Sequence, residues 1–222
     1  MVNKNNTGLS LIEIIVVTAV IAILAGLLFP AYTTARLHAK VARVHADLNQ
    51  IALAIKMYRL DWAGLPPVRS SCMNNAQIDY YEVPRELTNY GYLSEKVTLD
   101  PFNYTTDSQN REGRKYKYIA INWGYSNNTK TEFGMWIPRD YPTSNQECVL
   151  YYRKGGGYCV FDGGKTYAAD PPVLWAIWSV GPGGDPGWVA SGNRMLPVPK
   201  KEWYPYNRKG VIVLLSDGRS SP

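Results

Sequence analysis

A single carboxylate, Glu13, stands inside an otherwise apolar segment near the start of the 222-residue chain. No other charged residue occurs between Lys4 and Arg36. An apolar segment of about 18 residues or more is long enough to cross a membrane as a helix. An acidic side chain costs about 2.5–3.5 kcal/mol at the membrane centre, so it usually has a partner or a function there. A second interpretation places Glu13 at the lipid headgroups of a simple anchor, where the cost is smaller.

The other residues that could do chemistry do not form a catalytic pattern. The histidines His38 and His45 are seven residues apart, which is about 10 Å along a helix and too far to bind one metal ion. Residues 163–166 resemble the end of a phosphate-binding loop, but Cys159 stands where such a loop requires its first glycine. No two carboxylates have the spacing of a catalytic pair. The sequence therefore predicts a protein that is not an enzyme and has no cofactor.

Three cysteines, Cys72, Cys148 and Cys159, could form at most one disulfide. Cys148 and Cys159 flank a glycine-rich turn at residues 155–157, so we expect this pair if the domain lies outside the cytoplasm. The alternative is three reduced thiols that pack as small apolar side chains.

Residues 9 to about 61 predict one long helix. Beyond the membrane-length segment, apolar residues recur every three or four positions, which is typical of one buried helix face. A coiled-coil seam would show the same pattern, but the large domain that follows favours a helix that serves as the spine of that domain. Gly64 and Pro66 are expected to end the helix. The apolar positions are Leu37, Val41, Val44, Leu48, Ile51, Ile55 and Tyr58.

Pro30 interrupts the hydrogen bonding of this helix, because proline has no backbone N–H to bind the Gly26 carbonyl. We expect a kink or a locally unwound segment at residues 26–30. The alternative is a membrane helix that tolerates its proline without distortion.

The rest of the chain predicts a β-rich head. Residues 115–120 alternate between polar and apolar types, as a half-buried strand does, and residues 173–178 are apolar on both faces and should be the most buried strand. The expected fold class is α+β, with an antiparallel sheet and long loops packed on the outer half of the N-terminal helix. Further strands are expected at residues 131–137, 147–152, 158–162 and 210–215.

The formal net charge is +6, and most of the surplus lies close to the apolar segment. Residues 36–59 hold five basic side chains and one acid, whereas the charges beyond residue 60 nearly balance. Anionic headgroups or neighbouring acidic surfaces would favour such a segment. The near-neutral head does not suggest a nucleic-acid-binding protein.

Residues 8–32 resemble the class III leader of type IV pilins and type II secretion pseudopilins. Leu9 and Ser10 stand where this family most often has Phe and Thr. The resemblance implies that a membrane prepilin peptidase cleaves after Gly8 and methylates the new amino terminus of Leu9. A secretory signal peptide fits less well, because its apolar core should span about 7–15 residues. The residues that carry the resemblance most clearly are Gly8-Leu9-Ser10-Leu11-Ile12-Glu13.

Three further segments are similar to those of G-type major pseudopilins: residues 52–61 at the end of the helix, residues 87–93 followed by 99–102, and residues 179–185. Residues 103–172 have no counterpart in the compact members of that family. Many G-type pseudopilins bind Ca²⁺ in a C-terminal acidic loop, and here that region offers Asp185, with Asp217 far downstream. Because the acidic cluster of the family is missing, these two residues remain weak calcium candidates and no metal is expected.

The resemblance also implies an organisation and a set of partners. Residues 1–8 would be a cleaved leader, 9–35 the membrane and assembly half of the helix, 36–64 its amphipathic half and 65–222 the head. The subunit would sit in the bacterial inner membrane with a cytoplasmic N-terminus and a periplasmic head, although the basic residues after the span would by themselves favour the opposite orientation. It would polymerise with itself and with other pseudopilins on an inner-membrane assembly platform.

Within such a filament, the resemblance implies that Glu13 pairs with the methylated amine of Leu9 on a neighbouring subunit, and that the helix loosens between Gly26 and Pro30. A type IV pilus or DNA-uptake pilin is the alternative, supported by the basic and aromatic residues 200–204. A membrane-anchored enzyme is the third and least favoured class.

Overall fold

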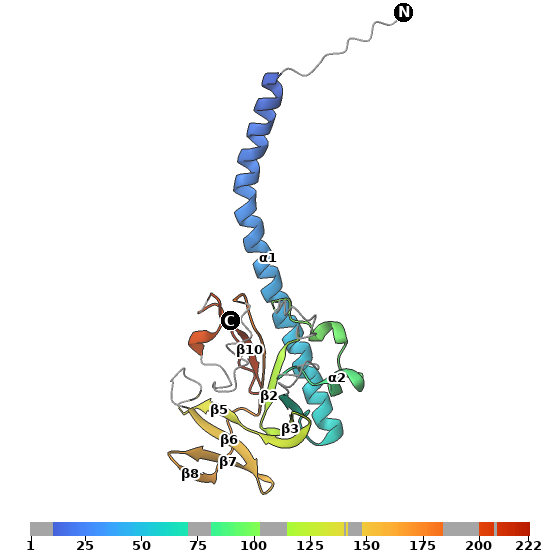
Figure 1. Ribbon diagram of the computed structural model, residues 1–222, viewed down its shortest axis with the longest axis vertical. Helices are drawn as coiled ribbons and strands as arrows, with labels where there is room; N and C mark the ends of the chain where they lie inside the picture. The colour runs from blue at the N-terminus through green and yellow to red at the C-terminus, as the bar shows by residue number, and fades with distance from the viewer. Residues whose placement is uncertain are drawn as a thin grey trace, which may run out of the picture. The chain divides into compact units, whose positions relative to one another are not determined.

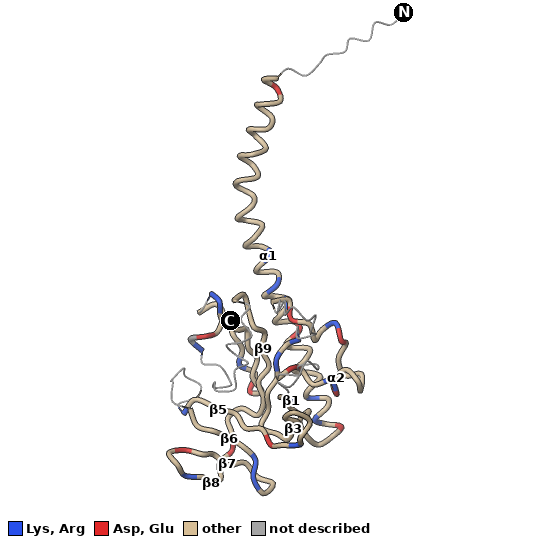
Figure 2. Tube along the Cα trace, in the orientation of Figure 1, with Lys and Arg blue, Asp and Glu red and all other residues tan. Residues whose placement is uncertain are grey.

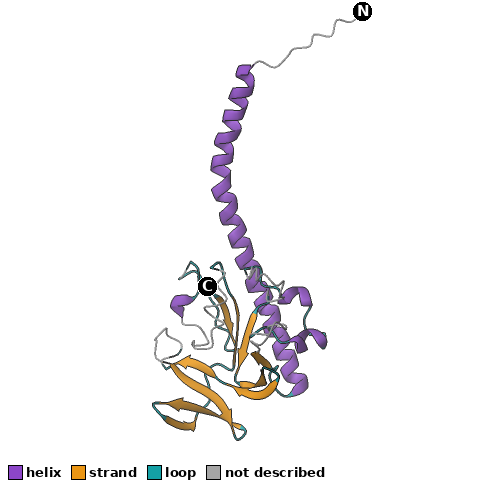
Figure 3. Cartoon of the chain, in the orientation of Figure 1, coloured by secondary structure: helices purple, strands orange, loops and turns teal. Residues whose placement is uncertain are grey.

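The computed structural model describes residues 11–70, 81–102, 115–139, 141, 148–183, 200–206 and 208–222. The chain divides into two compact units, Met1–Lys40 and Val41–Pro222. The first unit contributes the start of one long helix, and the second contributes the end of that helix and the β-rich head (Figures 1 and 3).

The predicted long helix is confirmed as α1, Leu11–Trp62, which is α-helical over all 52 residues. Pro30 lies inside it. The Pro30 carbonyl oxygen accepts hydrogen bonds from the hydroxyl groups of Thr33, at 2.9 Å, and Thr34, at 3.0 Å. An unwound segment at residues 26–30 is therefore not present in this structure, because a proline removes one hydrogen bond without forcing the helix to end. The kink, and the loosening on assembly, stay predictions.

In the second unit, one face of α1 is buried against the head. Val44, Leu48, Ile51 and Ile55 are at most 1% exposed, so the predicted apolar stripe is the spine of the domain. The described residues of the head form three sheets and three short helical segments. Helix α2 is Arg85–Asn89, and the two 3-10 helices are Glu95–Thr98 and Lys200–Glu202.

The first sheet has the order β1-β3-β4, the second β10-β9-β2 and the third β5-β6-β7-β8. All paired strands are antiparallel except β1 and β3, whose parallel pairing was not expected. The strands are β1 Val68–Ser70, β2 Lys117–Ala120, β3 Asn122–Ser126, β4 Thr129–Phe133, β5 Met135–Pro138, β6 Cys148–Lys154, β7 Gly157–Asp162, β8 Lys165–Ala168, β9 Trp175–Ser179 and β10 Ile212–Leu215.

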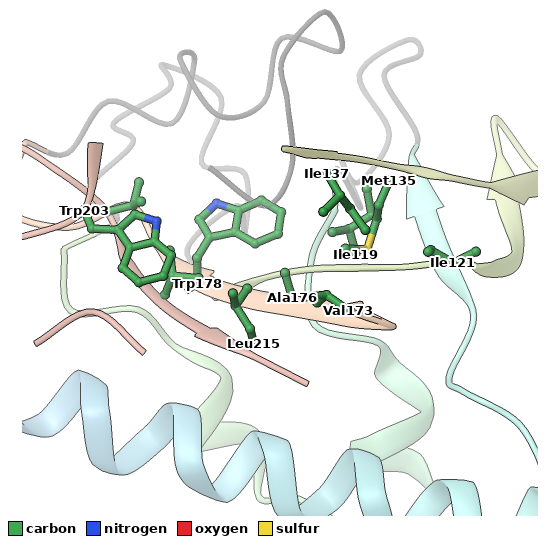
Figure 4. Close-up of a cluster of buried hydrophobic side chains, with 11 residues drawn as sticks. Ile119, Ile121, Met135, Ile137, Val173, Ala176, Trp178, Trp203 and Leu215 are labelled. Atoms are coloured by element: carbon green, nitrogen blue, oxygen red, sulfur yellow. The ribbon is translucent and has the colours of Figure 1, made fainter. Parts of the chain in front are cut away.

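The buried strand expected at residues 173–178 is confirmed as β9, which is buried at every position and lies between β10 and β2. The half-buried character expected for residues 115–120 is wrong, because all four residues of β2 are buried. Tyr118 donates its hydroxyl to the Pro66 carbonyl, while Ile119 belongs to an apolar cluster with Met135 and Trp178. Figure 4 shows this cluster on the face of the second sheet that lies away from α1.

The strand expected at residues 131–137 is two strands in two different sheets, β4 and β5. The break falls at Gly134, where an added Cβ would lie 2.6 Å from the carbonyl oxygen of Tyr151. The chain can therefore pass from one sheet to the next at this point only with glycine. Strands β1, β3 and β8 were missed, because they are short and carry no clear alternation.

The expected Cys148–Cys159 disulfide is wrong. In the hairpin of β6 and β7, Tyr152 is the partner of Cys159, and Cys148 stands opposite Pro138 of β5. Four residues of strand separate Cys148 from Tyr152, which is about 13 Å. A disulfide needs Cα atoms within about 7 Å, so the register keeps these two thiols apart. Cys72 lies outside the described residues.

Candidate assembly site

The first half of α1 exposes a continuous apolar surface. Its large apolar side chains between Leu11 and Tyr32 are 50–76% exposed. Within the described residues, α1 is the one helix long and apolar enough to cross a membrane, and none of its most apolar part is buried. Such a surface needs lipid or neighbouring helices to cover it, because a large exposed apolar patch is unfavourable in water.

Glu13 lies in the first turn of α1 and interrupts this surface. Figure 2 shows the long stretch of α1 that carries no charge after this one acidic position. Gly8 and Leu9 lie outside the described residues, so the cleavage junction and the expected Glu13–Leu9 pair stay predictions.

A buried carboxylate joins two of the family-like segments of the head. Asp100 is 5% exposed and accepts hydrogen bonds from the Ser179 hydroxyl at 2.8 Å and from the backbone N–H groups of Phe102 and Val180, each at 2.9 Å. Burial raises the pKa of Asp100, and these hydrogen bonds oppose the rise. The carboxylate therefore fixes the loop after β9 to the segment that follows α2.

The glycine next to this network is required by its surroundings. Gly181 has a φ of +69°, and an added Cβ would lie 1.9 Å from the carbonyl oxygen of Gly210. The Gly181 N–H also donates to the Ser179 hydroxyl at 3.0 Å. The sequence resemblance covers the two segments separately. No local pattern indicated that Asp100 and Ser179, 79 positions apart, form a hydrogen bond.

The described residues do not fit a calcium site. No group of three or more His, Cys, Asp or Glu side chains that could hold a metal ion occurs among them. The Asp217 carboxylate accepts hydrogen bonds from the Tyr141 hydroxyl and the Arg219 N–H and lies 3.4 Å from the Arg219 guanidinium. These donors and this cation occupy the oxygens that a calcium ion would need. Asp185 lies outside the described residues.

The other residues that the sequence singled out are two histidines on α1 and Trp203 in the apolar cluster. His38 is exposed on α1, and His45 is half-buried and hydrogen-bonded to the backbone of Pro222. Burial lowers the pKa of His45. Trp203, which supported the nucleic-acid alternative, is 4% exposed in the apolar cluster, with the Lys200 ammonium 5.9 Å from its ring centre. Its ring is not available to stack on a base.

An exposed apolar helix that begins with one carboxylate and continues into an α+β head defines a pilin-like protein. A family model described as the prokaryotic N-terminal methylation motif matches residues 3–29. The chain is 31% identical over 127 residues to the type II secretion system core protein G of Pseudomonas aeruginosa strain PAO1, a match that covers 54% of this chain and 78% of that protein. The chain therefore belongs to the family of type II secretion system core protein G, which confirms the predicted resemblance. No solved structure matches it.

Proposed function

We propose that the chain is a pseudopilin subunit that is cleaved after Gly8, methylated at Leu9 and polymerised into an inner-membrane-rooted filament of a type II secretion-like system. One observation carries this proposal. The exposed surface of α1 is free of charge from residue 14 to residue 35 and is preceded by a single carboxylate that lies five residues after the expected cleavage point.

The pair formed by the Glu13 carboxylate and the Leu9 amine sets the alignment of subunits, because either charge is unfavourable when it stands alone. A carboxylate and an ammonium are each unfavourable in an apolar bundle, and they become acceptable when they meet. In the filament, Glu13 accepts the methylated amine of Leu9 from a neighbouring subunit. Subunits shifted along the axis leave both charges without a partner, so the pair selects one axial register.

The same contact explains an open filament. Because Glu13 of one subunit meets the amino terminus of another, the two surfaces in contact differ. Repeated contacts of this kind that do not close on themselves generate a helix. Other pseudopilins, the prepilin peptidase and an inner-membrane assembly platform are the partners that this mechanism needs. In this arrangement the N-terminus is cytoplasmic and the head is periplasmic.

Processing and assembly are tested together in cells that contain prepilin peptidase and the assembly platform. The intact mass of the membrane-extracted protein is expected to correspond to residues 9–222 plus one methyl group, and shearing is expected to release filaments. A chain that keeps Met1 to Gly8, or one that is cut near residue 32, contradicts the proposal. The DNA-uptake alternative predicts filaments that bind single-stranded DNA, which the same preparation can test.

A further inference from the structure

One face of α1 carries an aromatic residue and two basic residues where the charge-free segment ends. Tyr32, Arg36 and Lys40 are spaced by four residues, and α1 is helical throughout this region. Side chains four residues apart lie one above another on the same face of a helix. Tyr32 is 64% exposed, Arg36 is exposed and Lys40 is partly exposed. We call these three residues the headgroup face.

The position of this face along α1 matches the thickness of a bilayer. Glu13 and Arg36 are 23 residues apart in one unbroken helix, which corresponds to a rise of about 35 Å. The hydrocarbon core of a bilayer is about 30 Å thick. When Glu13 lies near one headgroup layer, Arg36 therefore reaches the opposite one, and its long side chain can extend to the phosphates there.

The charges around this face favour an anionic ligand. After Glu13, the next acidic residue in the sequence is Asp47, eleven residues beyond Arg36. The Asp47 carboxylate already accepts the Tyr116 hydroxyl at 2.9 Å and lies 3.4 Å from the Arg43 guanidinium. Tyrosine is enriched at membrane interfaces, and basic residues close to a membrane attract anionic lipids.

We propose that Tyr32, Arg36 and Lys40 bind the phosphate groups of anionic phospholipids in the leaflet where α1 leaves the membrane towards the head. The lipid contact fixes the depth of the subunit and has to break when the helix leaves the bilayer for the filament. Each basic residue contributes about fivefold to the preference for an anionic over a zwitterionic lipid.

Spin-labelled lipids measure this preference on the full-length protein in phosphatidylcholine vesicles. Spin-labelled phosphatidylglycerol is expected to associate about 25-fold more than spin-labelled phosphatidylcholine at low salt, because Arg36 and Lys40 each contribute about fivefold. A concentration of 0.5 M NaCl should reduce the difference. Arg36→Gln should lower the preference about fivefold, and Arg36→Gln with Lys40→Gln should abolish it. The matched control is Lys56→Gln with Arg59→Gln, about 30 Å further along α1, which should leave the preference unchanged.

Two further results decide between ligands. If 20 mM inorganic phosphate removes the preference, the face binds free phosphate and the lipid proposal is wrong. Equal association of both lipids with the wild-type protein also overturns it, and then the basic residues serve an acidic protein surface. The wild-type measurement decides this even if the variants do not fold.

The inference rests on the proposed insertion of α1 in a membrane. Extraction of the same vesicles with alkaline carbonate separates the two proposals. Release of the wild-type protein contradicts the proposed function, whereas a protein that stays inserted without lipid preference contradicts the headgroup face alone.

Discussion

The hydroxyl group of Tyr116 donates a hydrogen bond of 2.9 Å to the carboxylate of Asp47, which lies on the buried face of α1. Tyr116 is fully buried and Asp47 is 7% exposed. Residues 69 positions apart are joined in this way, so the bond connects the spine helix to the start of the second sheet. Arg43 lies 3.4 Å from the same carboxylate and compensates part of its buried charge.

Tyr116→Phe should reduce the free energy of unfolding of the head by about 1–2 kcal/mol at pH 8, because the buried Asp47 loses its neutral donor. Burial raises the pKa of Tyr116. The folded phenol therefore stays protonated above pH 10, while the unfolded one ionises, so stability is lost as the pH rises above 10. Tyr116→Phe has no phenol to ionise at this position and does not lose stability in this way. The difference in the free energy of unfolding between wild type and variant should therefore shrink between pH 10 and 12. Urea unfolding at several pH values measures both effects, and Tyr206→Phe, on a 68% exposed ring, is the control.

Asp100→Ala should destabilise the head by about 3 kcal/mol, because it leaves the buried N–H groups of Phe102 and Val180 without their acceptor. Ser179→Ala should cost about 1 kcal/mol. The pKa of Asp100 is raised in the folded state, so the folded protein holds more protons than the unfolded one just above pH 4. Asp100 therefore makes the free energy of unfolding of the wild type fall as the pH rises just above 4. Asp100→Ala should lack this contribution to the pH dependence. An identical pH dependence in both proteins would show that Asp100 does not titrate with folding.

Glu13→Leu should insert into the membrane as well as the wild type or better, since it removes a charge that costs up to about 3 kcal/mol in lipid. Cleavage after Gly8 should continue, because the junction is unchanged. Filament growth should fail, because the neighbouring amine then enters the bundle at a cost of about 3–5 kcal/mol. Shearing and electron microscopy measure the filaments, with intact mass as the test of cleavage.

Two further variants sharpen the Glu13 experiment. Glu13→Asp should be intermediate, because its carboxylate is one methylene shorter. Thr18→Leu is the matched control, since it removes a polar group that hydrogen-bonds within its own helix, to the Ile15 carbonyl at 3.0 Å. It should assemble normally. Normal filaments from Glu13→Leu would show that Glu13 lies at the headgroups without a role in assembly.

Oxidation of the folded head should give no peptide that links Cys148 to Cys159, because the register of β6 and β7 holds them about 13 Å apart. The same treatment in denaturant should produce that linkage, which provides the control. Mass spectrometry of the non-reduced digest makes the comparison. A Cys148–Cys159 peptide from the folded protein would require a different hairpin register.

Residues 36–222 should form a soluble monomer, because the exposed apolar part of α1 has been removed. We also expect no hydrolytic activity, since no two carboxylates in the sequence have the spacing of a catalytic pair. Size-exclusion chromatography with light scattering measures the mass. Turnover of an ester, peptide or glycoside that one point mutation abolishes would contradict the expectation. The melting temperature of the same fragment should not change when EDTA is added, and a fall would point to a bound metal.

The sequence by itself determined the features that depend on local patterns. The charge-free segment, the long helix with its buried stripe, and the fully buried strand β9 each follow from the spacing of apolar residues along a few turns or one strand. The same is true of the leader, since its recognition depends on neighbouring residues around Gly8 and Glu13. These features need no contact with distant parts of the chain.

The tertiary structure decided what depends on residues far apart in sequence. The burial of both faces of β2 follows from the contact of Tyr118 with Pro66 on one side and from the apolar cluster around Ile119 on the other. The break at Gly134 follows from the close approach of the Tyr151 carbonyl. The separation of the cysteines follows from the register of β6 against β7, which the local alternation of residues cannot set. The meeting of Asp100 with Ser179 has a similar origin, because a hydrogen bond between a loop and the end of β9 forms only after the fold has placed both.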